Sequence, residues 1–300
     1  MQGAEAVEYI DAKTILSGYS DNPYWFGTNY NMNLYKGCAH GCIYCDSRSE
    51  CYQIEEFDRV RSKKDALQIL EKELQGKRKR GVVGLGAMSD TYNPFEKSLK
   101  ITRQALELID KYRFGVAIAT KSDLIVRDID IFKRIMEHSP VLLKLTITSA
   151  DDEMCKIIEP NVCPSSSRFR ALKELTESGI YTGVLLMPVL PFILDTPENI
   201  LSIVDKTKES GGRFIYAGFG VTLRQNQRAW YYYALDKHFK GLKQKYIEAY
   251  GDRYSCSIPN YEKIFKEFKN KCEHHGISYK MDEIISEYKK GYNKEQISFL

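Results

Sequence analysis

The sequence predicts an α/β protein built around a parallel sheet. Short apolar runs recur about every 30 residues, and longer stretches between them have apolar residues at three- and four-residue steps. This alternation is typical of repeated strand-helix units, in which each helix crosses over a face of the sheet. The composition agrees with this class, because 43% of the 300 residues are hydrophobic, which is enough to form a substantial core.

Six apolar runs are predicted as strands, and three amphipathic stretches between them as helices. Six strands with crossover helices form either an open doubly wound sheet or an incomplete barrel. In both architectures, ligands bind where the strands end. The predicted strands cover residues 29–35, 82–88, 114–120, 141–148, 181–189 and 213–220, and the predicted helices cover 65–75, 97–112 and 167–179.

The end of the sequence differs in character from residue 229 onward. It is rich in tyrosine, lysine and glutamate, and helical periodicity is clear over 237–250 and 261–275. The segment 258–260 (Ile-Pro-Asn) predicts a break between these helices. No low-complexity linker occurs, so we expect residues 229–300 to form a helical extension packed on the α/β part, residues 1–228, within a single domain.

The first residues, "MQGAEAVEYIDAKTIL", are acidic where a signal peptide would need a basic start. No apolar stretch reaches the roughly 18 residues of a membrane helix, so a cytoplasmic protein with no membrane contact is expected. The formal net charge of +4 is too small to imply nucleic-acid binding. The one dense basic run, "GKRKRG" at 76–81, is predicted as a solvated turn between a helix and a strand.

The stretch "GCAHGCIYCD" places Cys38, Cys42 and Cys45 in one loop after the first predicted strand. Three thiolates with this spacing can ligate three irons of a cubane cluster and leave the fourth iron without a protein ligand. An open iron can bind a substrate or a cofactor. Gly37 and Gly41 allow the backbone to wrap tightly around such a cluster.

A zinc site is the alternative for this loop, with His40 or Cys51 as the fourth ligand. Structural zinc usually takes paired cysteines from two places in the chain, and no second pair is present. The remaining cysteines have no comparable spacing and are expected to be buried free thiols. They are Cys51, Cys155, Cys163, Cys256 and Cys272.

The cysteine loop, with Tyr44 directly before its last cysteine, resembles that of the radical S-adenosylmethionine (SAM) enzymes. Further blocks follow the spore photoproduct lyase-like branch of these enzymes in order, and the resemblance covers about two thirds of the chain, from Asn31 to Gly220. The blocks are "GAMSDTYNPFEK", "TRQALELI", "IATKSDLIVRDID", "IIEPNVCPSSSRFRAL" and "LLMPVLPFILD".

This resemblance implies a partial (β/α)6 TIM-type barrel, a [4Fe-4S] cluster held by the three cysteines, and SAM bound to the open iron. One-electron reduction, by an external donor such as flavodoxin or ferredoxin, would yield methionine and a 5'-deoxyadenosyl radical. Carried over by position, Ser89 and Lys121 would contact SAM. The other implied cofactor-site residues are Tyr44, Asp90, Thr146, Arg168 and Met187, and Glu96 and Glu159 also fit the pattern of the branch.

Two departures from the branch bear on the substrate. Spore photoproduct lyases have a cysteine three residues before the aspartate of this block, which donates a hydrogen atom to the thymine product radical, whereas this chain has Ala87. They also usually have a tyrosine after the third cluster cysteine, where this chain has Asp46. DNA repair is therefore disfavoured, and a small-molecule substrate is expected.

Among compact members of the branch, the chain is similar to queuine lyases, which cleave the carbon–nitrogen bond that joins a cyclopentenediol to an aminomethyl-deazaguanine base. A purine-like ligand needs an apolar or aromatic slot and a carboxylate that accepts from its N–H edge. Candidate slot residues are Tyr30, Tyr35, Tyr92, Tyr216 and Phe219, and candidate carboxylates are Asp46 and Asp195.

Two other classes of function remain open at this point. The first is radical repair or modification of nucleic acid, which would show substantial affinity for DNA or tRNA that falls steeply with salt. The second is a non-enzymatic iron–sulfur or zinc protein, which would fail to cleave SAM under strong reductant.

Overall fold

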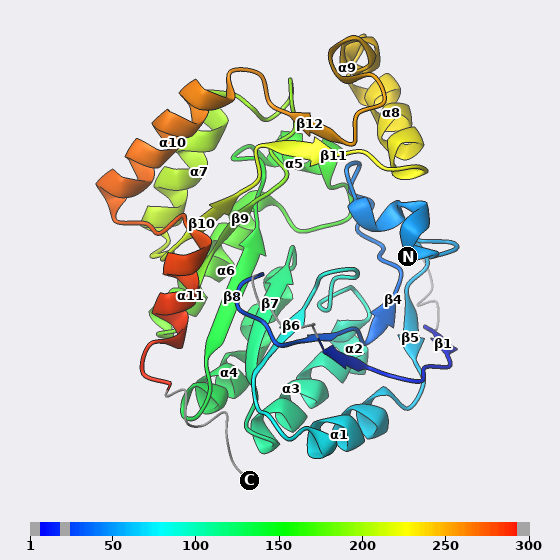
Figure 1. Cartoon of the computed structure of the whole chain (residues 1–300), viewed down its shortest axis with the longest axis vertical. Coiled ribbons are helices and arrows are strands. Elements are labelled where there is room, and N and C mark those ends of the chain that lie inside the picture. Colours follow the sequence, from blue (N-terminus) through cyan, green and yellow to red (C-terminus); the bar gives the residue numbers. More distant parts are fainter. Residues whose placement is uncertain (1–6, 19–24, 293–300) are drawn as a thin grey trace.

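The fold is described for residues 7–18 and 25–292 of a computed structural model. A seven-stranded sheet lies at its centre, in the order β10-β9-β8-β7-β6-β3-β2 (Figure 1). All neighbouring strands are parallel except β2, which pairs antiparallel with β3. The strands are β2 (Leu16–Gly18), β3 (Tyr30–Met32), β6 (Val82–Leu85), β7 (Gly115–Thr120), β8 (Val141–Thr146), β9 (Thr182–Leu186) and β10 (Ile215–Ala217).

The predicted α/β class and the five predicted strands after residue 80 are confirmed. The prediction of one strand over 29–35 is wrong, because the chain leaves the sheet after Met32. The next segment, β4 (Tyr35–Lys36), pairs with β5 (Arg61–Lys63) in a separate three-stranded sheet that also contains β1 (Glu8–Ile10).

Helices connect the central strands, as the periodicity predicts. The predicted helix over 97–112 is divided at Lys100, whose φ of 51° interrupts the helical backbone. The basic run 76–81 forms the connection from α1 to β6, as predicted. The helices are α1 (Ala66–Gly76), α2 (Glu96–Leu99), α3 (Ile101–Lys111), α4 (Ile129–Met136), α5 (Asp152–Ile158), α6 (Ser165–Glu177) and α7 (Pro197–Glu209), with 3-10 turns η1 (Asp46–Arg48), η2 (Glu50–Tyr52) and η3 (Asp123–Asp128).

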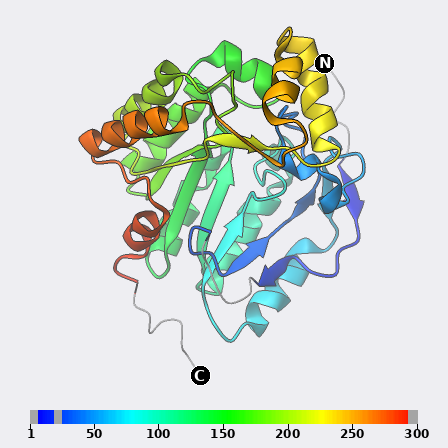
Figure 2. The same ribbon diagram turned by 45° about the horizontal axis from the view of Figure 1, so that its top comes forward.

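The tail after the central sheet contains mainly helices. Helix α10 packs on α7, α11 packs on β8, and α8 packs on α9 and η1 (Figures 1 and 2). No helix of the described residues is long and apolar enough to cross a membrane. The elements are β11 (Gly220–Thr222), α8 (Gln227–His238), α9 (Leu242–Tyr250), β12 (Ser255–Ser257), α10 (Tyr261–His275) and α11 (Met281–Lys289).

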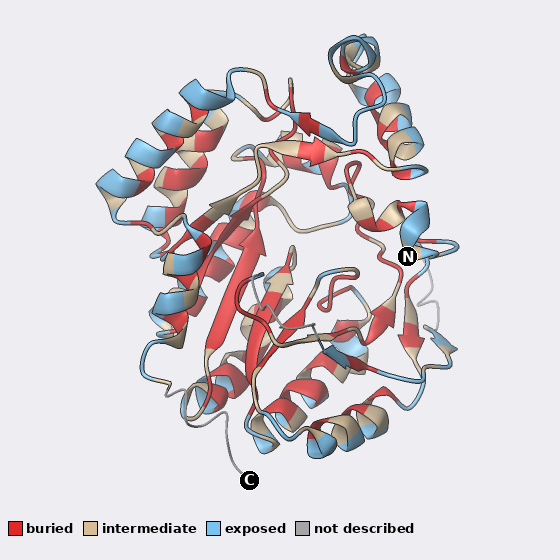
Figure 3. Ribbon diagram, in the orientation of Figure 1, coloured by how far each residue is buried: buried red, intermediate tan, exposed pale blue. Residues whose placement is uncertain are grey.

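The central strands are buried on both faces (Figure 3), as expected for a parallel sheet. Alternate side chains such as Val83, Ile118 and Leu143 belong to the main core together with the crossover helices. The side chains between them, which include Ala117 and Leu142, pack in a second cluster with Phe26 and with side chains of α11. We call the face of the sheet that carries this second cluster the inner face.

Candidate functional site

The three cysteines lie in a loop that directly follows β4, near the carboxyl ends of the central parallel strands (Figure 1). Two distant segments hold the backbone of this loop. The Cys38 amide donates to the carbonyl of Phe57 (2.8 Å), and the Ile43 amide donates to the carbonyl of Ile158 (3.0 Å). The loop is therefore fixed by tertiary contacts rather than by its own secondary structure.

Four side chains from three other parts of the chain bind carbonyl groups of the same loop. The hydroxyl of Ser89 is one of them, so this predicted SAM-contacting residue also supports the cysteine loop. The four bonds are Ser89 Oγ to Gly37 (2.5 Å), Asn161 Nδ2 to Ala39 (2.9 Å), Gln227 Nε2 to Tyr44 (3.0 Å) and Trp230 Nε1 to Cys42 (3.2 Å).

Gly37 is required by the close approach of the loop to the segment after η2. Its φ is +81°, and a Cβ atom at this position would lie 2.3 Å from the carbonyl oxygen of Arg59. A side chain would meet both backbone strain and a steric clash. Only glycine therefore fits at the position directly before the first cysteine.

Cys38 and Cys42 are buried and Cys45 is partly exposed, and the three thiols are close enough to affect one another. Burial raises the pKa of all three, that of Cys38 to about 11, and the nearby Lys121 acts in the opposite direction on Cys42 and Cys45. In a cubane each thiolate binds a different iron, so the three need not converge on one point. A loop of three sheltered thiols beside a cation, which can stabilise thiolates, fits a [4Fe-4S] cluster.

The two residues considered as a fourth zinc ligand lie in other environments. His40 faces Asp90, with Nδ1 3.6 Å from a carboxylate oxygen. Cys51 is exposed, and its sulfur accepts from a guanidinium nitrogen of Arg224 at 2.9 Å. In the described ranges, 7–18 and 25–292, no three His, Cys, Asp or Glu side chains form a set around a single ion.

Lys121 lies beside the loop, with Nζ 5.7 Å from the centre of the Tyr44 ring. Burial lowers the pKa of this ammonium, but the negative charges of Cys42, Glu159 and Asp90 outweigh burial, so the pKa is raised overall. Lys121 is therefore a stable cation at the rim. A cation in this position can bind a carboxylate.

The carboxylate of Asp90 organises the chain on either side of it. One oxygen accepts from the Thr120 hydroxyl (2.7 Å) and the Tyr92 amide (2.9 Å), and the other accepts from the Lys121 amide (2.8 Å). Asp90 thus connects the end of β7 to the segment after β6. Its contacts place Ser89 and Lys121 at the same edge of the sheet.

Glu159 and Arg168 form a fully buried ion pair, with nitrogen and oxygen 2.6 Å apart. The hydroxyl of Tyr44 also donates to Glu159. Arg168 donates to the carbonyl of Thr146 (2.7 Å) and to that of Cys163 (3.0 Å). Arg168 is placed to anchor the end of β8, and its donors are occupied by protein groups.

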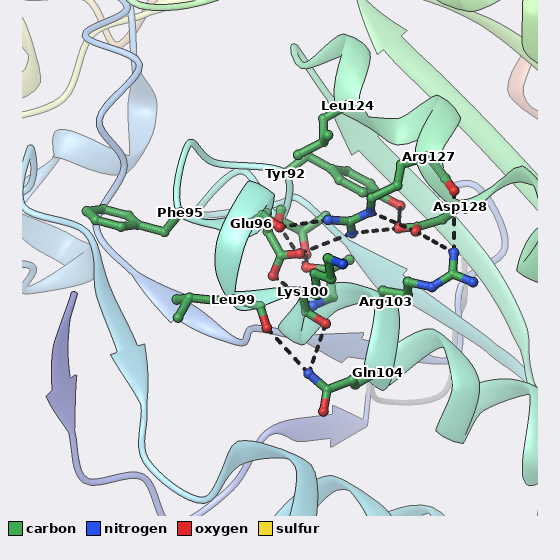
Figure 4. Close-up of polar contacts among 12 residues, drawn as sticks. Tyr92, Phe95, Glu96, Leu99, Lys100, Arg103, Gln104, Leu124, Arg127 and Asp128 are labelled. Carbon is green, nitrogen blue, oxygen red and sulfur yellow. Dashed lines mark hydrogen bonds and ion pairs between the residues drawn. The ribbon is translucent and has the colours of Figure 1, made fainter. Parts of the chain in front are cut away.

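A second buried network includes Tyr92, two residues after Asp90 in the chain (Figure 4). Glu96 accepts from the Tyr35 hydroxyl and from Arg127 (3.2 Å), while Asp128 accepts from the Tyr92 hydroxyl (3.0 Å). Both carboxylates are completely buried. The sequence resemblance associates Glu96 with the site. In the structure its carboxylate is buried and binds Tyr35 and Arg127, so Glu96 supports the site indirectly.

The other residues predicted to contact the cofactor lie at strand ends. Thr146 is the last residue of β8 and is buried. Met187 directly follows β9 and precedes a cis peptide bond to Pro188. Both are therefore at the same edge of the sheet as Lys121.

Three of the predicted substrate-slot residues have hydroxyl groups that bind other protein groups. Tyr30 begins β3 at the amino end of the parallel strands, where its hydroxyl donates to the carbonyl of Lys79 (2.8 Å). Tyr35 and Tyr92 are buried, and the carboxylates of the network described above bind their hydroxyl groups. The hydroxyl groups of Tyr35 and Tyr92 have structural partners, as buried hydroxyl groups require, whereas Tyr30 is only partly buried.

The remaining candidates are dispersed. Tyr216 lies edge-on to Phe26 on the inner face, and Phe219 packs against the rings of α10. Asp46, next to the cysteine loop, accepts a hydrogen bond from the Tyr52 hydroxyl (3.1 Å). Asp195 is partly buried, and burial raises the pKa of its carboxyl group. Of these four, Tyr216 lies on the inner face and Asp46 lies beside the cysteines.

The expectation of buried thiols elsewhere is correct for three cysteines and wrong for two. Cys155, Cys256 and Cys272 are buried, Cys163 is partly exposed and Cys51 is exposed. Cys51 lies in the short turn η2, where hydrogen bonds to Ser49 and Arg224 lower its pKa.

Sequence reasoning missed Asn161, Gln227 and Trp230, whose side chains bind the cysteine loop. Asn161 lies inside the block "IIEPNVCPSSSRFRAL", and its place in that block could have identified it as a residue near the site. Gln227 and Trp230 belong to α8, and no local pattern connects that helix to a loop more than 180 positions away. Lys144 was missed as well, because it lies within an apolar strand.

Comparison with known sequences finds uncharacterized relatives. A protein of Methanocaldococcus jannaschii, MJ0683, is 33% identical over 226 residues, which cover 75% of this chain and 79% of that protein. A protein of Mycobacterium bovis, Mb2609c, is 24% identical over 245 residues, or 79% of this chain and 72% of the relative. Both carry the description "uncharacterized".

Solved structures with a similar fold include a spore photoproduct lyase complexed with dinucleoside spore photoproduct, with a TM-score of 0.65 and 14% identity over 90% of this chain and 81% of that one. Another is the radical SAM methyltransferase TsrM of Kitasatospora setae with cobalamin and a [4Fe-4S] cluster bound, with a TM-score of 0.58 and 12% identity over 89% of this chain and 62% of that one. These likenesses concern the fold. The "Radical SAM superfamily" profile matches residues 32–204. With its sheltered cysteine loop at the carboxyl edge of a parallel sheet, the chain belongs to the radical SAM superfamily, whose enzymes use a [4Fe-4S] cluster and S-adenosylmethionine.

Proposed function

We propose that this radical SAM enzyme is a lyase that cleaves a carbon–nitrogen bond in a small molecule, and that its substrate is queuine or a close deazaguanine derivative. The product is a 7-aminomethyl-deazaguanine base, a precursor of queuosine. The observation that favours a small-molecule substrate over DNA repair is Ala87, which offers no thiol where spore photoproduct lyases have a hydrogen donor. The resemblance to queuine lyases supports the substrate.

The residues of the loop hold the cofactors in this proposal. Cys38, Cys42 and Cys45 bind three irons of the cluster. Lys121 binds the carboxylate of SAM, because its ammonium is stable and lies beside the thiols. Ser89 lies at the same edge of the sheet as Lys121. Its hydroxyl donates to the carbonyl of Gly37 and so helps to orient the cysteine loop.

When bound and reduced at Cys38, Cys42, Cys45 and Lys121, the cluster and SAM would supply radical chemistry able to abstract a hydrogen atom from the substrate. The protein positions the substrate and excludes water. Tyr44 and Glu159 form one buried wall of the cofactor site, together with Arg168. Thr146 and Met187 approach the same region from two neighbouring strand ends.

The arrangement of the whole chain follows from this site. We propose that the central strands form a partial (β/α)6 barrel and that residues 229–300 are an extension packed on it. Trp230, near the start of this tail, supports that interpretation, because its side chain donates to a carbonyl group of the cysteine loop. An external one-electron donor such as flavodoxin or ferredoxin reduces the cluster.

Parallel turnover assays test the proposal. Reconstituted enzyme, SAM and reductant are incubated with queuine or with dinucleoside spore photoproduct, and products are followed by liquid chromatography with mass detection. We expect the aminomethyl-deazaguanine base from queuine and no change in the dinucleotide. Repair of the dinucleotide with no deazaguanine product would overturn the assignment of carbon–nitrogen bond cleavage in a small molecule. Failure to cleave SAM at all, with a fully loaded cluster, would favour a non-enzymatic role.

A further inference from the structure

One lysine on the inner face of the sheet has no role in the site described above. Lys144 lies on β8 and is only 3% exposed. In the register of the sheet it lies between Ala119 on β7 and Gly183 on β9. It is two residues before Thr146, so both side chains are on the same face, and Lys144 is one layer deeper than the predicted cofactor site.

The structure gives Lys144 no hydrogen bond or ion pair with any residue in 7–18 or 25–292. Its ammonium lies 4.4 Å from the centre of the Phe26 ring. Burial alone lowers its pKa, to about 7. A buried ammonium without a carboxylate partner is costly, and such groups are rare unless they have a function.

The strands on either side contribute little side-chain volume at this depth. Ala119 carries only a methyl group. At position 183 a Cβ atom would lie 2.3 Å from the carbonyl oxygen of Phe214, so that position is restricted to glycine. The Phe214 ring fills the space at Gly183, with its Cδ1 atom 2.5 Å from that Cβ position, so a ligand would meet Lys144 from the side of Thr146 and the strand ends.

We propose that Lys144 is a substrate-binding residue that donates a hydrogen bond to the ring carbonyl oxygen of a guanine-like base; this inference rests on the proposed function. Lysine is a standard donor to the O6 atom of guanine, and 7-deazaguanines keep this oxygen. The amine can donate whether or not it is protonated. A lysine that is neutral part of the time also repels the secondary amine of queuine less than a permanent cation would.

Binding to the holoenzyme tests this role. Isothermal titration calorimetry, with cluster and SAM present, compares 7-deazaguanine with 2-amino-7-deazapurine, the same ring without the 6-oxo group. For Lys144→Met we expect a loss of about ten- to a hundredfold in affinity for 7-deazaguanine, and no change for 2-amino-7-deazapurine. Iron and sulfide content shows whether the variant keeps its fold and its cluster loop.

The matched control is Lys97→Met, because Lys97 is exposed on α2. It should bind both bases as the wild type does. Equal affinity of Lys144→Met and wild type for 7-deazaguanine would overturn the role of Lys144 and leave the lyase proposal intact. Absence of 7-deazaguanine binding by the wild type would instead contradict the substrate proposal itself.

Discussion

The guanidinium of Arg168 and the carboxylate of Glu159 lie 2.6 Å apart, and neither side chain is more than 1% exposed. This pair joins helix α6 to the end of α5. Through Tyr44, which donates to Glu159, it also reaches the cysteine loop. Arg168 also donates to the carbonyl of Thr146 at the end of β8, so the ion pair connects the sheet to the proposed cluster site.

Removing the charge of Arg168 should be strongly destabilising. Arg168→Met leaves Glu159 buried without its partner, which typically lowers the free energy of unfolding by about 3 to 5 kcal/mol. The control is Lys173→Met on the same helix, whose ion pair with Glu177 is exposed and should contribute less than about 1 kcal/mol. Urea unfolding of both variants measures the difference, and equal losses would show that the buried pair has no special weight.

Each of the three loop cysteines should be necessary for the cluster. Cys38→Ala, Cys42→Ala and Cys45→Ala are expected to abolish cluster assembly, because each removes the only protein ligand of one iron. Cys51→Ala should retain the cluster, since Cys51 is exposed in η2. Anaerobic iron and sulfide analysis decides, and wild-type content in any of the first three variants would exclude that cysteine as a ligand.

Lys121 should contribute to SAM affinity rather than to cluster assembly. Loss of a charge-assisted hydrogen bond costs about 1.5 to 3 kcal/mol, so Lys121→Ala should weaken SAM binding roughly ten- to a hundredfold while iron content is unchanged. Lys133→Ala, an exposed position on α4, serves as the control. Equilibrium dialysis with labelled SAM gives both affinities. Unchanged affinity in Lys121→Ala would place this lysine outside the cofactor site.

Gly86 should be intolerant of any side chain, because it lies against the neighbouring strand. Its φ is +87°, and a Cβ atom would lie 1.9 Å from the carbonyl oxygen of Ala119. Gly179 has nearly the same φ, +84°, but nothing lies within 4 Å of its Cβ position. Gly179→Ala should cost only the backbone strain, about 1 to 2 kcal/mol. Thermal unfolding should show a larger loss for Gly86→Ala, and similar losses would contradict the steric argument.

The stability of the protein should depend on pH through Lys144. Burial lowers its pKa from 10.5 to about 7 in the folded state. Between these two values the unfolded chain binds a proton at this site that the folded chain does not, so the free energy of unfolding rises with pH. Below about pH 7 both states are protonated and the full penalty of burial remains.

The variant Lys144→Met has no such group, so this pH-dependent contribution should disappear. The gain in stability of the variant over the wild type should be largest below pH 7 and should shrink as the pH rises toward 10. Denaturant unfolding at several pH values measures this difference. A difference that is constant from pH 6 to pH 10 would show that Lys144 does not titrate in this range.

The sequence by itself determined the α/β class, the five strands after residue 80 and the three cysteines of one loop. These features follow from local patterns, because apolar periodicity and ligand spacing are encoded over a few adjacent residues. The resemblance to radical SAM enzymes rests on the same kind of local blocks. It predicted the family that the comparisons then showed.

Only the tertiary structure decided what surrounds those cysteines. The first strand divides between two sheets because Tyr35 pairs with Ser62, and sequence periodicity cannot show which strand supplies the partner. Tyr35 and Tyr92 resembled slot walls in the sequence, yet buried carboxylates bind their hydroxyl groups. The support of the cysteine loop by Gln227 and Trp230, like the burial of Lys144, depends on contacts between segments distant in the chain, which folding alone brings together.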